Sequence, residues 1–143
     1  MSTILDMCYI SDLVMVDIGL WNKVTKGYSR MLITVDTGAS ITTISKDLLH
    51  TLGYNVSSGK QSRIITASSV EFVNDVTLEK IVLGDIELSN VRVYAHTFPE
   101  SSFSMGVLGL NVLKQFNVCF YFSRQELELF PPIAASAIPI WQK

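Results

Sequence analysis

The amino-acid sequence predicts a mainly β domain whose short strands close into a barrel, with one or two short helices. Apolar and polar residues alternate with a period of two along most of the chain, which is the pattern of half-buried strands. Turn-forming residues, above all glycine and aspartate, separate the alternating stretches. Closure into a barrel leaves the fewest open edges among so many short strands.

The first half of the chain contains three predicted strands and a helix. An amphipathic strand over residues 14–20 is followed by a polar turn, and a second strand over residues 31–35 runs directly into an Asp-Thr-Gly sequence. Residues 41–45 are rich in β-branched residues, which favour a third strand. Ser45 or Asp47 then caps a brief helix that ends at Gly53.

The middle of the chain contains two predicted β-hairpins. A strand over residues 63–66 turns at the tip Ala67-Ser68-Ser69 and returns over residues 70–83. Gly84-Asp85 predicts a tight turn into the next strand. The apolar alternation of that strand changes phase at Ser89-Asn90, which indicates a bulge or a bend.

The last third of the chain contains a loop, a helical turn and two strands. Residues 96–105 have the composition of a loop, and a helical turn or two is expected over residues 112–116. Strands are predicted at residues 118–122 and 127–129, joined by a turn at Ser123-Arg124.

Length and composition predict one cytoplasmic, oligomeric domain. The chain has 143 residues, enough for a single domain, and 48% of them are hydrophobic. The longest weakly polar run, residues 130–141, is too short to span a membrane and contains three prolines. Residues 1–10 lack the basic and apolar regions of a secretory signal. The high mean hydropathy of +0.34 is therefore best explained by an apolar surface that is buried in an oligomer.

Charge and residue spacing exclude several classes of function. The net charge is −2 and basic residues are scattered, so a nucleic-acid partner is not expected. Neither histidine nor cysteine occurs at a spacing typical of metal ligands, and we expect no metal and no cofactor. The serines lack the Gly-x-Ser-x-Gly setting of a serine hydrolase.

Asp36 is the candidate catalytic residue. It follows an apolar strand, where a carboxylate is costly unless it is hydrogen-bonded or shares a proton with a partner. Gly38 allows the backbone to pass close to the acid, and the hydroxyl of Thr37 can brace the loop. Asp36, Thr37 and Gly38 therefore form the predicted catalytic group.

Peptide hydrolysis by two carboxylates is the chemistry that such a loop serves. One ionised carboxylate takes a proton from a water molecule, while the other, protonated, polarises the scissile carbonyl. Two acids held close together share one proton, because they cannot both ionise. Since one chain supplies one such loop, the second carboxylate requires a homodimer with twofold symmetry.

Two segments of the chain resemble the signatures of the retropepsin-like aspartic proteases. Residues 33–40, Ile-Thr-Val-Asp-Thr-Gly-Ala-Ser, resemble the active-site loop of that family. In residues 106–116, Gly109, Asn111 and Leu113 match the second signature. The resemblance implies an acid-protease barrel that forms one half of a symmetric dimer. It also implies a single domain over residues 1–143, with its core at about 14–130 and extensions at 1–13 and 131–143.

The resemblance also implies roles for the residues of the loop. Asp36 would be catalytic, and Thr37 would tie the two loops together across the dimer. Gly38, Ala39 and Ser40 would present backbone groups to a polypeptide substrate.

The flap and one ion pair depart from the viral pattern of this family. The resemblance implies a flap with Ala67, Ser68 and Ser69 at its tip, contacting substrate and excluding water. Viral flaps are glycine-rich at the tip, so this one is expected to be stiffer or differently shaped. Ser40 and Leu110 replace an acid and a base that pair in viral enzymes; because both are missing, no buried charge is left unpaired. The chain therefore resembles cellular and bacterial members more than viral ones.

Three functions remain open from the sequence. An aspartic endopeptidase that uses two Asp36 carboxylates is favoured, because Asp36, Thr37 and Gly38 are all intact. The alternative is a catalytically silent retropepsin-like module for dimerisation or peptide binding. A barrel that binds a small apolar ligand would require the Asp-Thr-Gly match to be accidental.

Overall fold

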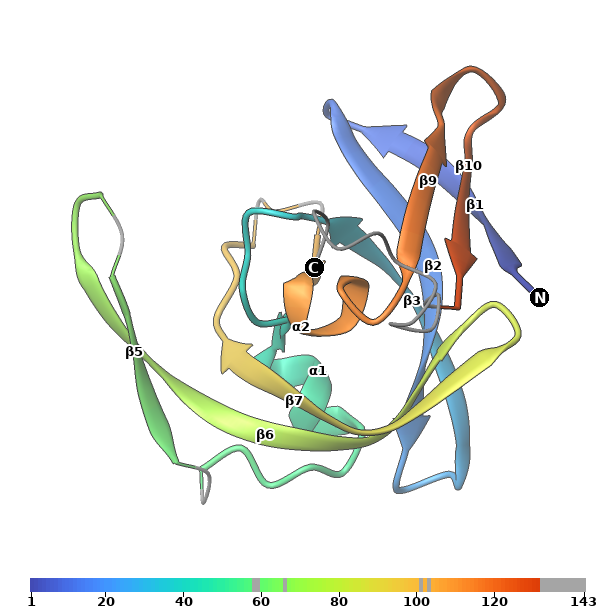
Figure 1. The fold of residues 1–143 in the computed structure, drawn as a ribbon. Coiled ribbons are helices and arrows are strands. Elements are labelled where there is room, and N and C mark those ends of the chain that lie inside the picture. The colour runs from blue at the N-terminus through green and yellow to red at the C-terminus, as the bar shows by residue number, and fades with distance from the viewer. Residues whose placement is uncertain (58–59, 66, 101, 103, 132–143) are drawn as a thin grey trace, which may run out of the picture.

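The computed structural model describes residues 1–57, 60–65, 67–100, 102 and 104–131, so most of the predicted C-terminal extension lies outside the described residues. The predicted class is confirmed, because strands dominate and the helices are short (Figure 1). The strands are β1 (Thr3–Ile10), β2 (Leu13–Asn22), β3 (Gly27–Val35), β4 (Thr43–Ser45), β5 (Gln61–Ile65), β6 (Val70–Leu83), β7 (Ile86–His96), β8 (Gly106–Leu108), β9 (Asn117–Tyr121) and β10 (Glu126–Phe130). The helices are α1 (Lys46–Thr51), α2 (Leu110–Leu113) and the 3-10 turn η1 (Phe122–Arg124).

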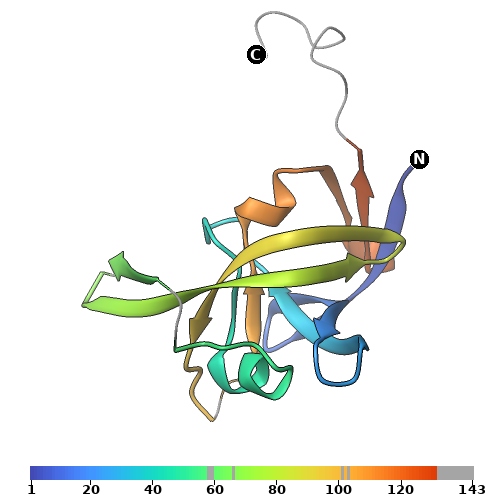
Figure 2. The ribbon, with the colours of Figure 1, turned by 90° about the horizontal axis from the view of Figure 1, so that it is seen from below.

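The strands form one sheet that closes on itself. Its order is β5-β6-β7-β4-β8-β3-β2-β1-β10-β9, and β6 also pairs with β2. This second pairing places Gly19 opposite Val82 and Leu20 opposite Ile81. It makes a closed ring of β2, β3, β8, β4, β7 and β6, so the predicted closure is confirmed. β5 extends the ring at β6, while β1, β10 and β9 continue beyond β2 (Figures 1 and 2).

Alternate residues of the ring strands fill its interior. Burying one such aliphatic side chain contributes about 1.5–3 kcal/mol to stability. Members of this core with at most 2% exposure include Val16, Ile18, Leu20, Ile33, Ile44, Leu78, Ile81, Leu83, Val93 and Leu108.

The long β6–β7 hairpin bends without a bulge. Leu83 pairs with Ile86 near the turn and Asn74 with Ala95 far from it, in one constant register, so neither strand has an inserted residue. Asn90 has a left-handed φ of 54°, and along β6 the buried positions change from even to odd numbers opposite it. The predicted change of phase is therefore a bend and not a bulge. At this bend the buried and exposed faces of both strands exchange, and the hairpin curves around the ring (Figure 1).

β1 corrects the prediction that residues 1–13 lie outside the core. This strand pairs with both β2 and β10. Thr3, Leu5 and Met7 are at most 6% exposed, whereas Ile4 between them is 49% exposed. An apolar residue on the outer face hides the period-two pattern in the sequence. β1 and β10 thus join the two ends of the described chain within one subunit.

The helices follow local signals. Ser45 caps α1, since its Oγ accepts a hydrogen bond from the Leu48 N–H at 3.4 Å, and Gly53 after the helix has a φ of +93°. α2 is a single turn of four residues and begins at Leu110, two residues before the predicted start. Within the described ranges, no helix has both the length and the apolar character needed to cross a membrane.

Glu128 on β10 joins the strands at the two ends of the chain. Its carboxylate accepts hydrogen bonds from the Ser2 hydroxyl, next to β1, and from the Tyr121 hydroxyl on β9, at 2.9 Å for the latter. The bond from Ser2, then that from Tyr121, and the charge of Arg124 hold the pKa of the Glu128 carboxyl below its ordinary value. The ionised carboxylate therefore stabilises the folded state at pH values above its ordinary pKa, and this contribution is lost as the pH falls through the lowered pKa.

Glu128→Gln is expected to lower the melting temperature more at about pH 7 than at about pH 3, because protonation removes the same charge from the wild type. Thermal unfolding followed by circular dichroism at both pH values measures the difference. Glu100→Gln is the matched control, since the Glu100 carboxylate makes no ion pair or hydrogen bond with the described residues. A deficit in Glu128→Gln that stayed constant or grew toward low pH would contradict this role.

Candidate active site

Asp36 lies where two parallel strands end side by side. β3 and β8 pair through Thr34 opposite Val107 and Val35 opposite Leu108. The Asp36 N–H donates to the Leu108 carbonyl at 3.1 Å, which continues this pairing by one residue. The catalytic candidate is therefore attached to the closed ring and not to a free loop.

The Asp36 loop, residues 36–40, folds back on its own carboxylate. The Gly38 N–H donates to Asp36 Oδ1 at 2.8 Å, and the Ala39 N–H donates to the Asp36 carbonyl at 3.3 Å. A Cβ at position 38 would lie 3.0 Å from Oδ1, so glycine makes this close approach possible. Asp36, Thr37 and Gly38 are exposed. The loop thus holds one carboxylate oxygen by a backbone amide and presents the group at the surface of the single chain.

Gly109 and the start of α2 support the loop from beneath. A Cβ on Gly109 would lie 2.8 Å from the Ala39 carbonyl oxygen, so only glycine allows the two backbones to come this close. The N–H of Leu110 donates to the Ala39 carbonyl at 2.8 Å, and that of Asn111 to the Ser40 carbonyl at 3.0 Å. Amides at the start of a helix have no partner within the helix, and here the Asp36 loop supplies one.

Thr42 and Asn111 lock the loop to α2 from the side. Thr42 is fully buried, and both its N–H and its hydroxyl donate to Asn111 Oδ1 at 2.8 Å. The Gly109 N–H donates to Thr42 Oγ1 at 3.0 Å. Loss of the hydroxyl would leave buried polar groups without partners, at a cost of about 1–3 kcal/mol.

Sequence reasoning missed Thr42 as part of the site. The sequence identifies Asn111 only as a match to the second signature, although its side chain is the centre of this hydrogen-bond group. The available sequence signal for Thr42 was a hydroxyl within a stretch of β-branched residues. Threonine is common in such stretches because of its strand propensity alone, so this signal does not single out Thr42. The partner lies 69 positions away in the chain, so the pairing is visible only in the fold.

The flap hairpin consists of β5, its tip with residues 67–69 and the first part of β6. It projects from the ring in two views at right angles (Figures 1 and 2). Ala67, Ser68 and Ser69 are all exposed at the tip. Below it, Ile65 and Val70 pair across the hairpin and are 73% and 52% exposed.

The flap also carries Phe72, which is 66% exposed. It follows Val70 by two residues on β6 and so lies on the same face of the hairpin. The side chains of Ile65, Val70 and Phe72 are thus exposed on a projecting element. Such exposure is typical of a surface that contacts another molecule. The sequence showed these residues only as ordinary strand formers.

The structure brings residues 36–40 together in one braced loop and places residues 67–69 separately at the flap tip. Their catalytic and substrate-binding roles stay predictions. In the part of the chain that the structure describes, no three His, Cys, Asp or Glu side chains are grouped as a metal ion requires. A single solvated carboxylate is the chemical group that this site offers.

Known proteins share this architecture. A sequence profile of the family described as gag-polyprotein putative aspartyl protease matches residues 24–115. The structure of a retropepsin-like aspartic protease from Rickettsia conorii is similar, with a TM-score of 0.62, 20% sequence identity and coverage of 90% of each chain. The retroviral protease-like domain of Ddi1 from Leishmania major matches with a TM-score of 0.43 and 12% identity, over 96% of this chain and 99% of that chain. No curated protein sequence matches significantly.

The profile match spans the Asp36 loop, the flap hairpin and α2. At 20% identity the Rickettsia structure establishes the fold alone. The retropepsin-like fold predicted from the sequence is thereby confirmed.

Gly109→Ala is expected to lower the free energy of unfolding by about 1–3 kcal/mol, because the new methyl group would meet backbone atoms that cannot rotate away. Gly27→Ala is the matched control: its Cβ would have no heavy atom within 4 Å. Urea unfolding of both variants measures the difference. Equal stabilities for the two variants would show that the contact beneath the loop is not tight.

Proposed function

The chain belongs to the gag-polyprotein putative aspartyl protease family, and from this premise we propose that it is an aspartic endopeptidase active as a homodimer. The observation that carries the proposal is the Asp36 carboxylate. It is exposed, held through Oδ1 by the Gly38 amide and supported from beneath by α2. A rigid support with an outward carboxylate is what a catalytic acid needs in order to meet a second one.

The reaction is peptide-bond hydrolysis by two Asp36 carboxylates that share one proton. The ionised carboxylate accepts a proton from a water molecule, whose oxygen attacks the scissile carbonyl. The protonated carboxyl donates a hydrogen bond to the carbonyl oxygen, where negative charge develops. A twofold axis beside the loops brings the equivalent residues face to face.

The neighbours of Asp36 have matching roles. Within the described part of the chain, the Thr37 hydroxyl has no hydrogen-bond partner, which leaves it available to bind the loop of the second subunit. Of the backbone groups of Gly38, Ala39 and Ser40, the Gly38 carbonyl and the Ser40 N–H make no hydrogen bond within the described residues and would be offered to an extended substrate. The substrate would bind as an added strand, through hydrogen bonds to exposed main-chain donors and acceptors.

The flap hairpin supplies the other wall of the substrate site. Ala67, Ser68 and Ser69 at its tip would contact the substrate backbone and exclude water on closure. The exposed side chains of Ile65 and Val70 beside the tip favour a polypeptide with apolar residues over a small polar substrate.

Asp36→Asn is expected to reduce kcat/KM for peptide cleavage by at least about 10⁴-fold, because an amide cannot accept the proton of the attacking water. Mass spectrometry of an unfolded protein substrate, incubated at about pH 3–8, measures cleavage. Wild-type activity should also be blocked by a statine-type transition-state mimic.

Asp12→Asn is the matched control, since Asp12 lies in the β1–β2 turn with a φ of 63°, a conformation that asparagine tolerates. It should leave cleavage unchanged. Sedimentation should show that Asp36→Asn stays dimeric. A wild type that cleaves nothing over this pH range yet binds peptides would instead be the catalytically silent module, and a purely monomeric wild type would contradict both functions.

A further inference from the structure

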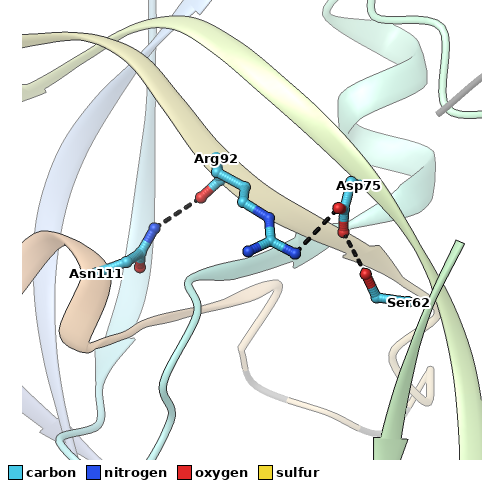
Figure 3. Close-up of polar contacts among 4 residues, drawn as sticks. All are labelled: Ser62, Asp75, Arg92 and Asn111. Atoms are coloured by element: carbon cyan, nitrogen blue, oxygen red, sulfur yellow. Dashed lines mark hydrogen bonds and ion pairs between the residues drawn. The ribbon is translucent and has the colours of Figure 1, made fainter. Parts of the chain in front are cut away.

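Asp75 closes the base of the flap hairpin. Its N–H donates to the Lys60 carbonyl at 2.7 Å, and its Oδ1 accepts a hydrogen bond from the Ser62 hydroxyl on β5 at 2.9 Å (Figure 3). Asp75 therefore binds β5 through its side chain and the residue before β5 through its backbone. It lies at the base of the flap hairpin, away from its tip.

Arg92 on β7 binds the other oxygen of the same carboxylate. Its Nη2 lies 3.0 Å from Asp75 Oδ2. Asp75 is opposite Tyr94 in the sheet, so Arg92 is its diagonal neighbour on the same face. The guanidinium also lies over the Tyr94 ring, 5.3 Å from its centroid, which further limits its orientation.

The backbone of Arg92 is held from the opposite side by α2. Its carbonyl accepts a hydrogen bond from Asn111 Nδ2 at 2.7 Å (Figure 3). The Oδ1 of the same amide accepts both bonds from Thr42. A continuous path of polar contacts thus runs from Ser62 through Asp75, Arg92 and Asn111 to the support of the Asp36 loop. We call it the flap–loop path.

A second ion pair shows that this arrangement is not a general consequence of strand pairing. Asp17 and Arg30 are diagonal neighbours on β2 and β3 in the same geometry and also form an ion pair. Within the described residues, neither side chain makes a further polar contact toward the flap or α2. Such partly exposed pairs contribute little to stability, so stability alone does not account for the connections of Asp75 and Arg92.

We propose that the flap–loop path sets the resting position of the flap hairpin relative to the Asp36 loop, and that Asp75 and Arg92 are positioning residues of the protease. The ion pair is 51% exposed on the Arg92 side and 18% on the Asp75 side, so it can break and reform during flap motion. Its effect on cleavage rests on the proposed function, whereas its effect on flap mobility does not.

Hydrogen–deuterium exchange of the protein tests the proposal without depending on activity. In Asp75→Asn and Arg92→Gln, amides of β5, the first part of β6 and residues 39–42 should exchange roughly threefold faster or more, because the ion pair that links the flap hairpin to Arg92 is lost, while the bond from Asn111 to the Arg92 carbonyl remains. Arg92→Lys should restore part of the protection, since an ammonium group can still pair with Asp75. Arg30→Gln is the matched control and should leave these amides unchanged.

Kinetics provide the second measurement. With an active wild type, Asp75→Asn and Arg92→Gln should raise KM several-fold with a smaller change in kcat, while a loss of folded dimer would lower activity without raising KM. Unchanged exchange in both variants, the same increase in Arg30→Gln, or faster exchange with an unaltered KM would overturn the proposal. If the wild type proves inactive while exchange rises as expected, the proposed function fails and the flap–loop path stands.

Discussion

The site depends on one close contact, that of the Gly109 backbone with the underside of the Asp36 loop. Because position 109 has no side chain, α2 can begin directly beneath the loop and donate the Leu110 N–H to the Ala39 carbonyl at 2.8 Å. α2 also carries Asn111, which binds Thr42 on one side and Arg92 on the other. A larger residue at position 109 would separate α2 from the loop and weaken all of these bonds together.

The contacts with α2 satisfy one part of the Asp36 loop within the single chain and leave the other part exposed. The carbonyls of Ala39 and Ser40 are satisfied within the chain, and the polar groups of Thr42 are buried and paired. Asp36 and Thr37, in contrast, are exposed. On the proposed function, the single chain is therefore complete as a fold and incomplete as a catalyst, since only a second copy supplies the partner carboxylate.

Local features of the fold could be predicted from the sequence, whereas its long-range pairings could not. The cap at Ser45, the turn at Gly84 and the Asp36 loop each follow from a few neighbouring residues, and each lies where predicted. The closure of the ring through β2 and β6, the strand β1 and the role of Thr42 depend on residues far apart in the chain. An alternating pattern indicates that a strand exists but not which strand it pairs with, and in β1 the exposed Ile4 hid even the alternation.

In the proposed function, Asp36 works as a pair across a twofold axis. A crystal structure of the protein with a bound statine-type inhibitor would test this pairing. We expect a symmetric dimer in which both Asp36 carboxylates lie about 3 Å from the inhibitor hydroxyl, with the two flap hairpins over the inhibitor. An inhibitor bound to one chain alone, or a dimer in which the two Asp36 side chains face solvent on separate surfaces, would show that the two carboxylates do not act as a pair.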